Sequence, residues 1–556
     1  MNDIRRAILW VVFGFSMVML WDQWQVYNGQ KATFFPTPAT TAASGAASGA
    51  ASGAVPVPSA TPAAAVAAAE PPVRTAPRER IDVRTDVLEL SFDTEGGSIV
   101  GSAFLKYPDR TDPSRPQRLF ELSPERVYVA QTGLVGAHGP NHQTPMRFSG
   151  ERVLADGANE LVLRFESDPK DGVQLVKTYR LRRGSYAIDV THEVLNVGSA
   201  AVAPKVYLQL VRDGNKLEGE SRFYSTFTGP AVYTEQGKYQ KIDFDAISKG
   251  KADFVREAKD GYVAMVQHYF ASAWILPAGT PRENFVRKVG DNLYAVGMIT
   301  PLAELAPGAS ARAQAQLFVG PQEEKVLEAL APGLELVKDY GWLTILAKPL
   351  YWLLDKLHAV LGNWGWSIVA LVVLLKIAFY WLNAKAYASM AKMKSINPRI
   401  MELRERYKDN PQQMQQEMMR IYREEKVNPM GGCLPIMIQI PVFIALYWVL
   451  LSSVEMRGAP WILWIKDLSA PDPYFILPLL MTASTLLQTA LNPAPPDPMQ
   501  AKMMWFMPLI FSVMFFFLPS GLVLYWFTNN VLSIVQQWII NVRMGVPPKL
   551  HLPKFR

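Results

Sequence analysis

The longest uncharged stretch of the chain indicates its fold class. Residues 503–542 read MMWFMPLIFSVMFFFLPSGLVLYWFTNNVLSIVQQWIINV, forty positions without Asp, Glu, Lys or Arg. A helix needs about 20 apolar residues to cross a hydrocarbon core of ~30 Å. The stretch therefore holds two such helices, and Pro519, Ser520 and Gly521 mark the turn between them. We predict two spans, 503–518 and 521–542, of which the first is short enough to favour local thinning of the bilayer.

Four more apolar segments precede this stretch and raise the expected number of spans to six. Three of them lie at 363–384, 431–453 and 474–491. The fourth, 1–21, begins with basic residues and lacks the small residues of a cleavage site, so we interpret it as an uncleaved anchor rather than a signal peptide. Composition agrees with a membrane protein, because only 19% of the residues are charged, against roughly 25% in soluble domains.

The charges of the loops predict the orientation. Residues 385–430 carry ten Lys and Arg, whereas the loop 454–473 carries two. By the positive-inside rule, residues 385–430, the short loop 492–502 and the tail 543–556 are cytoplasmic. The loop 454–473 and the segment between the anchor and residue 363 then lie on the outer side.

The outer segment begins with a tether and continues as a β domain. Residues 22–80 are rich in Ala, Pro, Ser and Gly and cannot bury a core. Between 81 and 330 apolar residues often recur at every second position, as in Val87–Phe92, and an Arg-Gly-Ser turn at 183–185 suggests a hairpin. We predict a large all-β sandwich. The single cysteine, Cys433, excludes an intrachain disulfide.

Apolar residues at helical spacing follow the β domain. Between 331 and 362, Tyr340, Ala347, Leu354 and Leu361 recur every seven positions, with charged residues between them. An amphipathic helix along the outer membrane interface fits this pattern. A helix packed on the β domain is the alternative.

The cytoplasmic segment 385–430 has an apolar seam of its own. The residues that define it and its turn are Met393, Ile400, Leu403, Tyr407 and Asp409. Asn410 and Pro411 then begin a second helix, so we predict an antiparallel helical hairpin. Two interpretations stay open: the seam closes on itself, or the methionines of this segment offer an adaptable surface to apolar clients.

Lys376 is the one charge within the five core spans. Its insertion costs about 3 kcal/mol, and these spans contain no Asp or Glu to neutralise it. Polar residues of the same and neighbouring spans complete a candidate groove: Lys376, Tyr380, Asn383, Gln439, Asn529, Asn530, Ser533, Gln536 and Gln537. Interhelical hydrogen bonds explain the amides well, but the unpaired lysine favours a hydrated cavity.

Several enzyme classes lack their sequence signatures here. The chain has no Gly-x-x-x-x-Gly-Lys-[Ser/Thr] phosphate loop, no His-Glu-x-x-His and no Gly-x-Ser-x-Gly motif. We therefore expect no enzyme activity, no cofactor and no metal site. The alternative function is a polytopic transporter or channel with a sugar-sensing outer domain, although the core spans lack the acids typical of coupled transport.

Five motifs together resemble those of a known family, the YidC/Oxa/Alb membrane protein insertases. They are Asn428-Pro-Met-Gly-Gly-Cys-Leu-Pro435, Gln439-Ile-Pro-Val-Phe443, Trp464-Ile-Lys-Asp-Leu468, Asp472-Pro-Tyr-Phe-Ile-Leu-Pro478 and Phe517-Leu-Pro-Ser-Gly-Leu-Val-Leu-Tyr525. The resemblance covers about residues 340–545, and the anchor with its outer domain is similar to the Gram-negative form.

This resemblance implies a polytopic α-helical membrane protein with six spans, a five-helix insertase core and a large periplasmic β-supersandwich similar to sugar mutarotases. It implies residence in the bacterial inner membrane, with both termini cytoplasmic. The family generally has Arg at the position of Lys376, so the charge is kept here while the planar fork is lost. Pro441, Phe443, Tyr525 and Trp526 match positions near the path of the incoming client helix.

The implied function is the insertion, folding and assembly of inner-membrane proteins, alone or with the Sec translocon, without nucleotide hydrolysis. The expected partners are nascent membrane-protein clients, Sec components, membrane lipids and, through the cytoplasmic loops, the ribosome. Direct binding of nucleic acid is not expected.

Overall fold

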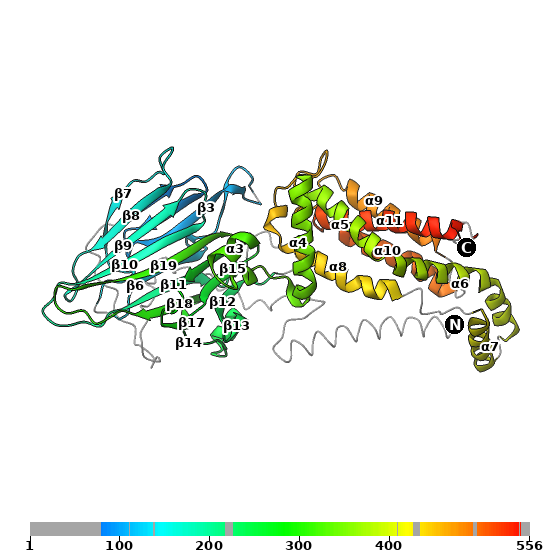
Figure 1. The fold of residues 1–556 in the computed structure, drawn as a ribbon, viewed down its shortest axis with the longest axis horizontal. Coiled ribbons are helices and arrows are strands. Elements are labelled where there is room, and N and C mark those ends of the chain that lie inside the picture. The colour runs from blue at the N-terminus through cyan, green and yellow to red at the C-terminus, as the bar shows by residue number, and fades with distance from the viewer. Residues whose placement is uncertain are drawn as a thin grey trace. The chain divides into compact units, whose positions relative to one another are not determined.

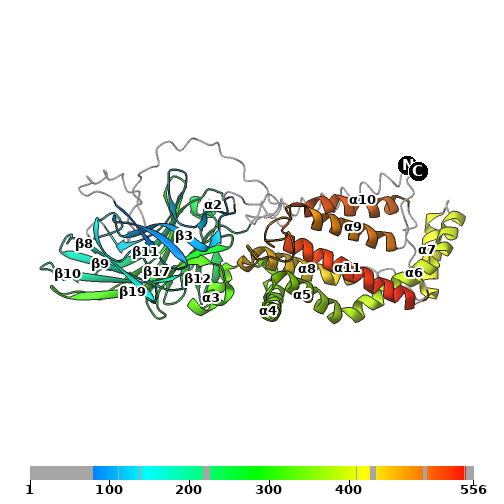
Figure 2. The same cartoon turned by 90° about the horizontal axis from the view of Figure 1, so that it is seen from above.

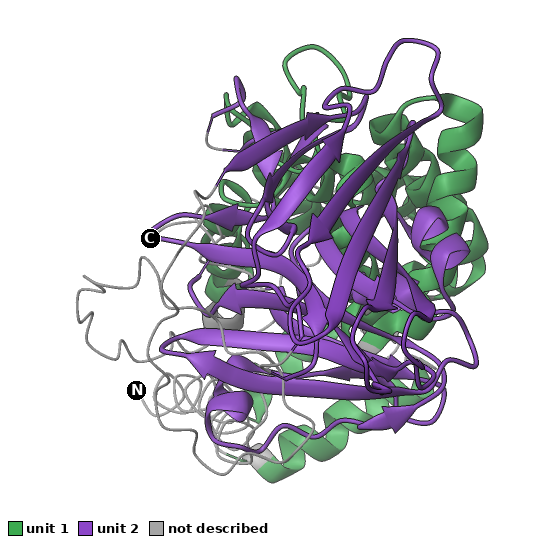
Figure 3. Cartoon of the chain, turned by 90° about the vertical axis from the view of Figure 1, so that its left-hand side faces the viewer, with its two compact units in different colours: residues 1–38, 340–556 green, residues 39–339 purple. Residues whose placement is uncertain are grey.

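A computed structural model describes residues 79–110, 112–136, 139–216, 226–407, 410–425, 434–492, 498–543 and 545. Among the predictions that lie outside these residues are the anchor 1–21, nearly all of the tether 22–80, Asp409 and most of the tail 543–556. The described chain divides into two compact units between Asp339 and Tyr340 (Figure 3).

The unit that ends at Asp339, unit 2 of Figure 3, contains two antiparallel sheets (Figure 1). The larger has the strand order β1-β2-β3-β6-β11-β18-β17-β14, with β4 beside β3 and β5 beside β6. Its strands are β1 (Arg80–Arg84), β2 (Leu88–Asp93), β3 (Ser98–Pro108), β4 (Pro116–Arg118), β5 (Glu121–Leu122), β6 (Val127–Leu134), β11 (Lys205–Asp213), β14 (Glu257–Ala258), β17 (Arg282–Gly290) and β18 (Leu293–Pro301).

The second sheet of this unit has the strand order β13-β12-β15-β16-β19-β10-β9-β8-β7. Its strands are β7 (Met146–Gly150), β8 (Glu160–Ser167), β9 (Val173–Arg182), β10 (Ala187–Asn196), β12 (Gly229–Thr234), β13 (Lys238–Lys241), β15 (Tyr262–Gln267), β16 (Phe270–Ile275) and β19 (Ser310–Pro321). Two helices, α2 (Phe244–Ser248) and α3 (Glu324–Leu330), and the 3₁₀ turn Leu334–Val337 complete the unit.

Large side chains join the two sheets face to face. Phe104 on β3 stacks on Phe270 of β16 with 4.8 Å between the ring centroids. The indole Nε1 of Trp274 on β16 donates a hydrogen bond to the carbonyl oxygen of Gln209 on β11, at 3.2 Å. The period-two pattern is visible in the alternating exposure of β1 and β8. The predicted domain rich in antiparallel strands is therefore confirmed, as is the hairpin around residues 183–185, which joins β9 to β10.

A lysine lies inside this sandwich. Lys177 on β9 is fully buried, and its Nζ donates hydrogen bonds to the carbonyl oxygens of Gly96 (2.5 Å) and Thr132 (2.7 Å). Within the described ranges no carboxylate forms an ion pair with it. Burial therefore lowers the pKa of Lys177 to about 7. The neighbouring His192 on β10 is also buried, and its burial, followed by the charge of Lys177, lowers its pKa to about 3.

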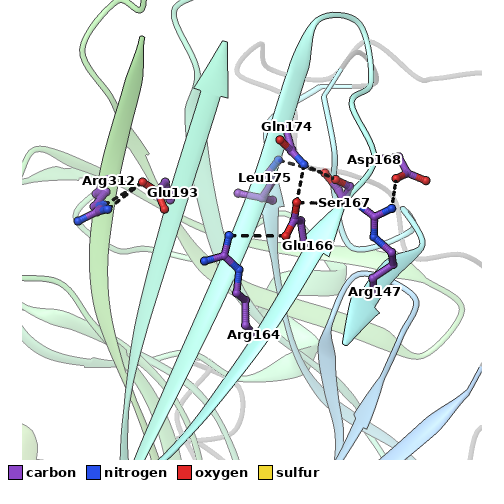
Figure 4. Close-up of polar contacts among 9 residues, drawn as sticks. All are labelled: Arg147, Arg164, Glu166, Ser167, Asp168, Gln174, Leu175, Glu193 and Arg312. Atoms are coloured by element: carbon purple, nitrogen blue, oxygen red, sulfur yellow. Dashed lines mark hydrogen bonds and ion pairs between the residues drawn. The ribbon is translucent and has the colours of Figure 1, made fainter. Parts of the chain in front are cut away.

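The nine-stranded sheet carries a set of paired charges that is drawn in Figure 4. Each arginine drawn there faces an acid across or along the strands. The pairs are Arg147–Asp168 at 3.1 Å, Arg147–Glu166 at 3.8 Å, Arg164–Glu166 at 3.5 Å and Arg312–Glu193 at 2.9 Å. The arginines are well exposed, so each pair adds at most about 1 kcal/mol to stability. Their charges balance locally, which is typical of a solvated sheet face.

The unit that begins at Tyr340, unit 1 of Figure 3, is helical. Figures 1 and 2 show α4 lying crosswise to helices α8, α9, α10 and α11. Its helices are α4 (Thr344–Leu361), α5 (Trp364–Ala378), α6 (Tyr380–Arg406), α7 (Pro411–Glu424), α8 (Leu434–Ser452), α9 (Ile476–Leu491), α10 (Pro498–Phe515) and α11 (Ser520–Arg543). Their common core includes Leu354 of α4, Ile368 of α5, Leu446 of α8 and Leu522 of α11. The helical C-terminal part is thus confirmed.

The structure differs from the sequence-based helices in two places. The amphipathic helix begins only at Thr344, because Gly333 and Gly341 adopt positive φ angles and break the pattern before it. The segment 363–384 is not one straight helix: α5 and α6 meet at Phe379 with a bend of 62°. Neither proline nor glycine, the common causes of a kink, lies at this bend. Pro441 lies inside α8 without interrupting it.

The length and apolar composition of each helix indicate whether it could span a bilayer. Of the helices in the described ranges, none is by itself long and apolar enough to span a membrane. The bent pair Trp364–Ala378 with Tyr380–Ser389 meets the requirement when its two parts are taken together.

The expected cytoplasmic hairpin consists of the second half of α6 and α7. Ile396 and Ile400 are buried against Met418, Ile421 and Tyr422, so this seam closes on itself. Asn410 caps α7 by accepting a hydrogen bond from the backbone N–H of Gln413, as its sequence predicts. Of the residues named for the seam, Met393, Ile400 and Leu403 lie in α6 and Tyr407 ends it. Met401 and Met419 remain exposed, which leaves methionine side chains available on the surface.

The buried Lys177 predicts a characteristic pH dependence of the β unit. The unfolded state keeps the proton up to pH ~10.4, whereas the folded state loses it near pH 7. Stability is therefore lowest below pH 7 and rises with pH above it. Between pH 7 and 9 we expect a gain of roughly 2 kcal/mol and a rise in Tm of about 5 °C. Calorimetry of Lys177→Met should show a flat profile over this range; an equal rise in wild type and variant would contradict the assignment.

The closed seam predicts a position-specific effect in the hairpin. Ile400→Asp places a charge among apolar side chains and should destabilise the contact between α6 and α7 by several kcal/mol. Met401→Asp, one position away and exposed, should have little effect. Amide hydrogen exchange over residues 411–424 measures the difference. Equal protection in the two variants would show that the seam does not hold the hairpin together.

Candidate functional site

The helical unit contains a pocket with apolar walls and several polar groups. It lies between α5, α6, α8 and α11, and its space of about 430 Å³ includes open solvent at its mouth. Its lining residues are Val372, Leu375, Lys376, Phe379, Leu382, Asn383, Gln439, Val442, Tyr525 and Asn529. Five of the nine groove residues named from the sequence line it or hydrogen-bond directly to a lining residue: Lys376, Asn383, Gln439, Asn529 and Ser533.

Lys376 is held in this pocket by a hydroxyl group. Its Nζ donates a hydrogen bond to Ser533 Oγ at 2.7 Å, and Ser533 Oγ donates to the carbonyl oxygen of Asn529 at 2.7 Å. Within the described parts of the chain, Lys376 forms no ion pair with a carboxylate. An ammonium group has three donors, so this arrangement positions the charge while leaving it without a neutralising partner.

A second polar contact crosses the pocket between α8 and α11. Gln439 Nε2 donates a hydrogen bond to Asn529 Oδ1 at 2.7 Å. The amide of Asn529 and the hydroxyl of Ser533 are four positions apart and therefore lie on one face of α11. Together with Lys376 they form a polar strip along that face, which the apolar side chains of Val372, Leu375, Phe379, Leu382 and Val442 border.

Two of the predicted groove residues face another helix. Asn530 Nδ2 donates hydrogen bonds to Thr485 Oγ1 (2.8 Å) and Ser484 Oγ (3.3 Å) of α9. Gln537 Nε2 donates to Asn492 Oδ1, directly after α9, at 3.0 Å. At about 100° per residue, Asn530 lies about 100° and Gln537 about 80° around α11 from Asn529. Asn530 and Gln537 thus connect helices and do not line the pocket.

Tyr380 and Gln536 are also absent from the pocket lining. Tyr380 stands four positions after Lys376, a spacing that would place both side chains on one face of a straight helix. The bend at Phe379 breaks that spacing, and the Tyr380 side chain is 44% exposed. Gln536 is buried, and neither its Nε2 nor its Oε1 has a hydrogen-bond partner among the residues that the structure describes.

The predicted client-contact residues form an aromatic group next to the pocket. Phe443 of α8 meets Trp526 of α11 edge to face at 4.0 Å and stacks on Tyr525 at 5.9 Å. Tyr525 is almost fully buried and lines the pocket. Pro441 lies within α8, two positions before Phe443. The structure therefore places Phe443, Tyr525 and Trp526 at the interface of α8 and α11, whereas Pro441 lies about 200° around α8 from Phe443.

Sequence reasoning missed the apolar half of the site. Val372, Leu375, Leu382 and Val442 stand among other apolar residues of their spans, so no signal distinguished those that border a pocket from those that face lipid or core. Among the described residues, no group of three His, Cys, Asp or Glu side chains is placed to hold a metal ion.

Comparison with known proteins gives matches along almost the whole chain. The family model of the YidC periplasmic domain matches residues 80–353, and that of the 60Kd inner membrane protein matches residues 356–546. The membrane protein insertase YidC of Cupriavidus necator is 56% identical over 551 residues, which are 98% of each chain. That of Ralstonia nicotianae is 56% identical over 557 residues, covering 99% of this chain and 100% of the relative.

A crystal structure of an active YidC insertase, with its first transmembrane domain resolved, aligns with 83% of this chain and 92% of its own at 18% identity and a TM-score of 0.39. The assignment rests on the sequence relatives, whose identity is high and whose length is shared. The chain belongs to the YidC family of membrane protein insertases.

Proposed function

We propose that the chain inserts membrane proteins into the bacterial inner membrane and that the pocket around Lys376 is the groove that receives the client. The observation that carries this proposal is a lysine inside an apolar helical unit that is held by a serine hydroxyl and by no carboxylate of the described residues. Such a charge attracts an acidic or strongly polar segment from outside the protein. The relatives named as membrane protein insertases support the same activity.

The physical task of the groove is to lower the barrier for a hydrophilic client segment. Each polar backbone group that enters hydrocarbon without a partner costs several kcal/mol. Lys376, Asn383, Gln439 and Asn529 offer such partners at one place, and water within the pocket offers more. No nucleotide is needed, because the client's own apolar span releases about 25 cal/mol for each Å² that it buries in lipid.

The apolar walls of the pocket suit the step in which the client's apolar span moves into lipid. Val372, Leu375 and Val442 present a hydrocarbon surface directly beside the polar strip. A client helix that is polar at one end and apolar along its length can contact both at once. As its polar end crosses, its apolar face moves along these walls and into lipid. The aromatic group of Phe443, Tyr525 and Trp526 borders this path on the α8–α11 side.

We further propose the topology that the sequence predicts. The anchor 1–21, the bent pair α5–α6, and helices α8, α9, α10 and α11 supply six spans, with α10 as the short one. The β unit is periplasmic, as the match to a periplasmic-domain family supports. The basic hairpin of α6 and α7 lies in the cytoplasm, where its exposed Met401 and Met419 contact nascent clients.

The partners follow from the same topology. Nascent membrane proteins are the clients, and lipids surround the helical unit. The Sec translocon and, at the cytoplasmic loops, the ribosome are further partners in this proposal. The family membership supports both, and co-purification with each tests them separately.

Lys376 should act through its charge. Lys376→Ala should lower the insertion of clients with acidic translocated tails about tenfold, which corresponds to ~1.4 kcal/mol of lost attraction. Lys376→Arg should retain insertion, because it keeps the positive charge. Clients with neutral tails should be less affected, since the amides remain. Protease protection of both client types in proteoliposomes is the measurement.

The matched control for this experiment is Lys385→Ala. Lys385 lies on α6, with its Nζ 3.7 Å from the ring centroid of Trp381, outside the pocket lining. The Lys385→Ala variant should insert both client types as well as wild type does. Equal insertion of acidic tails by Lys376→Ala and wild type would contradict the role of the groove charge.

Insertion should depend on the helical unit rather than on the β unit. Deleting residues 81–338 should leave insertion of a simple client largely intact, because every pocket residue lies after residue 370 and the β unit has its own core. Leu354→Asp, which places a charge on the buried face of α4 against α5 and α8, should abolish it. Ile345→Asp, on the exposed face of α4, is the control. Loss of insertion on deleting the β unit would refute this separation of roles.

A further inference from the structure

One loop contacts the beginnings of the two helices that form the polar part of the pocket. At the start of α5, Asn363 Nδ2 donates hydrogen bonds to the carbonyl oxygens of Pro460 and Trp461, both at 3.2 Å. At the start of α11, the backbone N–H groups of Ser520 and Gly521 donate to the carbonyl oxygens of Ala470 and Leu468, both at 2.8 Å. The loop 454–473 thus joins the helix that carries Lys376 to the helix that carries Ser533.

Two glycines allow this close approach. A Cβ at Gly365 would lie 2.3 Å from Trp461 Cδ1, and a Cβ at Gly521 would lie 3.1 Å from the carbonyl oxygen of Leu468. The loop is also packed into the unit, because Ile465 and Leu468 are buried in the common core of the helices. The carbonyl groups of this packed loop therefore hold the first residues of α5 and α11 in place through hydrogen bonds.

The conformation of the loop depends on a buried carboxylate. Asp472 is only 1% exposed. Its Oδ1 accepts hydrogen bonds from the indole Nε1 of Trp464 and the backbone N–H of Tyr474, both at 3.0 Å. Its Oδ2 accepts one from the backbone N–H of Leu477, in the first turn of α9, at 2.7 Å. Asp472 thus ties the middle of the loop to the start of α9, and hydrogen bonds to an ionised acceptor are the strong ones.

The geometry of the pocket is sensitive to how α11 begins. Ser533 lies thirteen positions after Ser520, about 20 Å along the helix. A tilt of about 5° at the start would move Ser533 by almost 2 Å over that length. Such a displacement would separate Ser533 Oγ from Lys376 Nζ, which are 2.7 Å apart, because hydrogen bonds weaken beyond about 3.2 Å.

We propose that Asp472 is a positioning residue of the groove: through Trp464 and the start of α9 it holds the loop 454–473 in the one conformation that aligns α5 with α11. The expected effect of this positioning on insertion rests on the proposed function. The inference adds a residue that contacts neither client nor pocket and yet determines where Lys376 and Ser533 meet.

The test measures the alignment of the two helices and insertion in the same protein. In the full chain carrying Cys433→Ser, spin labels at Ile377→Cys on α5 and Val535→Cys on α11 report the separation of the helices by pulsed electron resonance in proteoliposomes. Both positions have exposed side chains. Asp472→Asn keeps the shape of the side chain but turns one acceptor oxygen into a donor. The matched control is Asp467→Asn, whose Oδ1 accepts only from Ser469 N and Oγ within the same loop in the described structure.

We expect Asp472→Asn to shift the mean distance by about 1–2 Å, or to broaden its distribution, and to lower the insertion of acidic-tailed clients several-fold. Asp467→Asn should match the parent in both measurements. An unchanged distance in Asp472→Asn overturns the inference whatever happens to insertion, since a residue that only stabilises the fold alters the amount of folded protein and not this distance. A shifted distance with unchanged insertion supports the positioning role and contradicts the proposed groove instead.

A second variant decides the matter if Asp472→Asn cannot be recovered. Gly521→Ala leaves Asp472 intact and replaces glycine by a better helix former, yet its Cβ presses on the carbonyl oxygen of Leu468. The inference predicts a distance shift and reduced insertion in this variant as well. A Gly521→Ala protein with the parental distance would overturn it.

Discussion

An ammonium group among apolar helices must be provided with acceptors, and the helical unit is arranged around that requirement at Lys376. Ser533 Oγ accepts a hydrogen bond from Lys376 Nζ and donates one to the backbone carbonyl oxygen of Asn529, and Gln439 Nε2 donates one to Asn529 Oδ1. Three helices are thereby connected through one charge. Because no carboxylate of the described residues pairs with that charge, the polar strip holds Lys376 in place without neutralising it, and it remains available to a polar client segment.

Each unit contains a buried or partly buried lysine, and the two lysines differ in their access to a ligand. Lys177 in the β sandwich is fully enclosed and its donors end on backbone carbonyl oxygens, so burial favours its neutral form and the charge has no access to a ligand. Lys376 lines a pocket that is open to solvent and is only partly buried. A buried lysine is thus a structural element in one unit and the proposed recognition element in the other, and the difference lies in what surrounds it.

The loop 454–473 fixes the end of the helical unit at which α5 and α11 begin, and the pocket lies further along these two helices. The loop 454–473 folds into the common core and supplies carbonyl acceptors to the first N–H groups of α11, which a helix cannot satisfy by itself. The open part of the unit lies around the bend at Phe379, where α5 and α6 diverge by 62°. A fixed end and a bent end suit a site that must keep its polar groups aligned while an apolar helix passes beside them.

The sequence alone determined the elements whose signal is local. Alternating apolar residues predicted the β strands, forty uncharged positions predicted the helices α10 and α11, and Asn410 with Pro411 predicted the start of α7. It also singled out Lys376, because a lone charge in an apolar span is visible without a structure.

Tertiary structure alone decided which helix faces contact one another. Asn529 and Asn530 are adjacent in sequence, yet one lines the pocket and the other bonds to α9, because helical periodicity defines a direction and only packing defines the neighbour in that direction. The bend at Phe379 and the three hydrogen bonds of Asp472 likewise depend on contacts between distant or irregular segments, which no periodic pattern records.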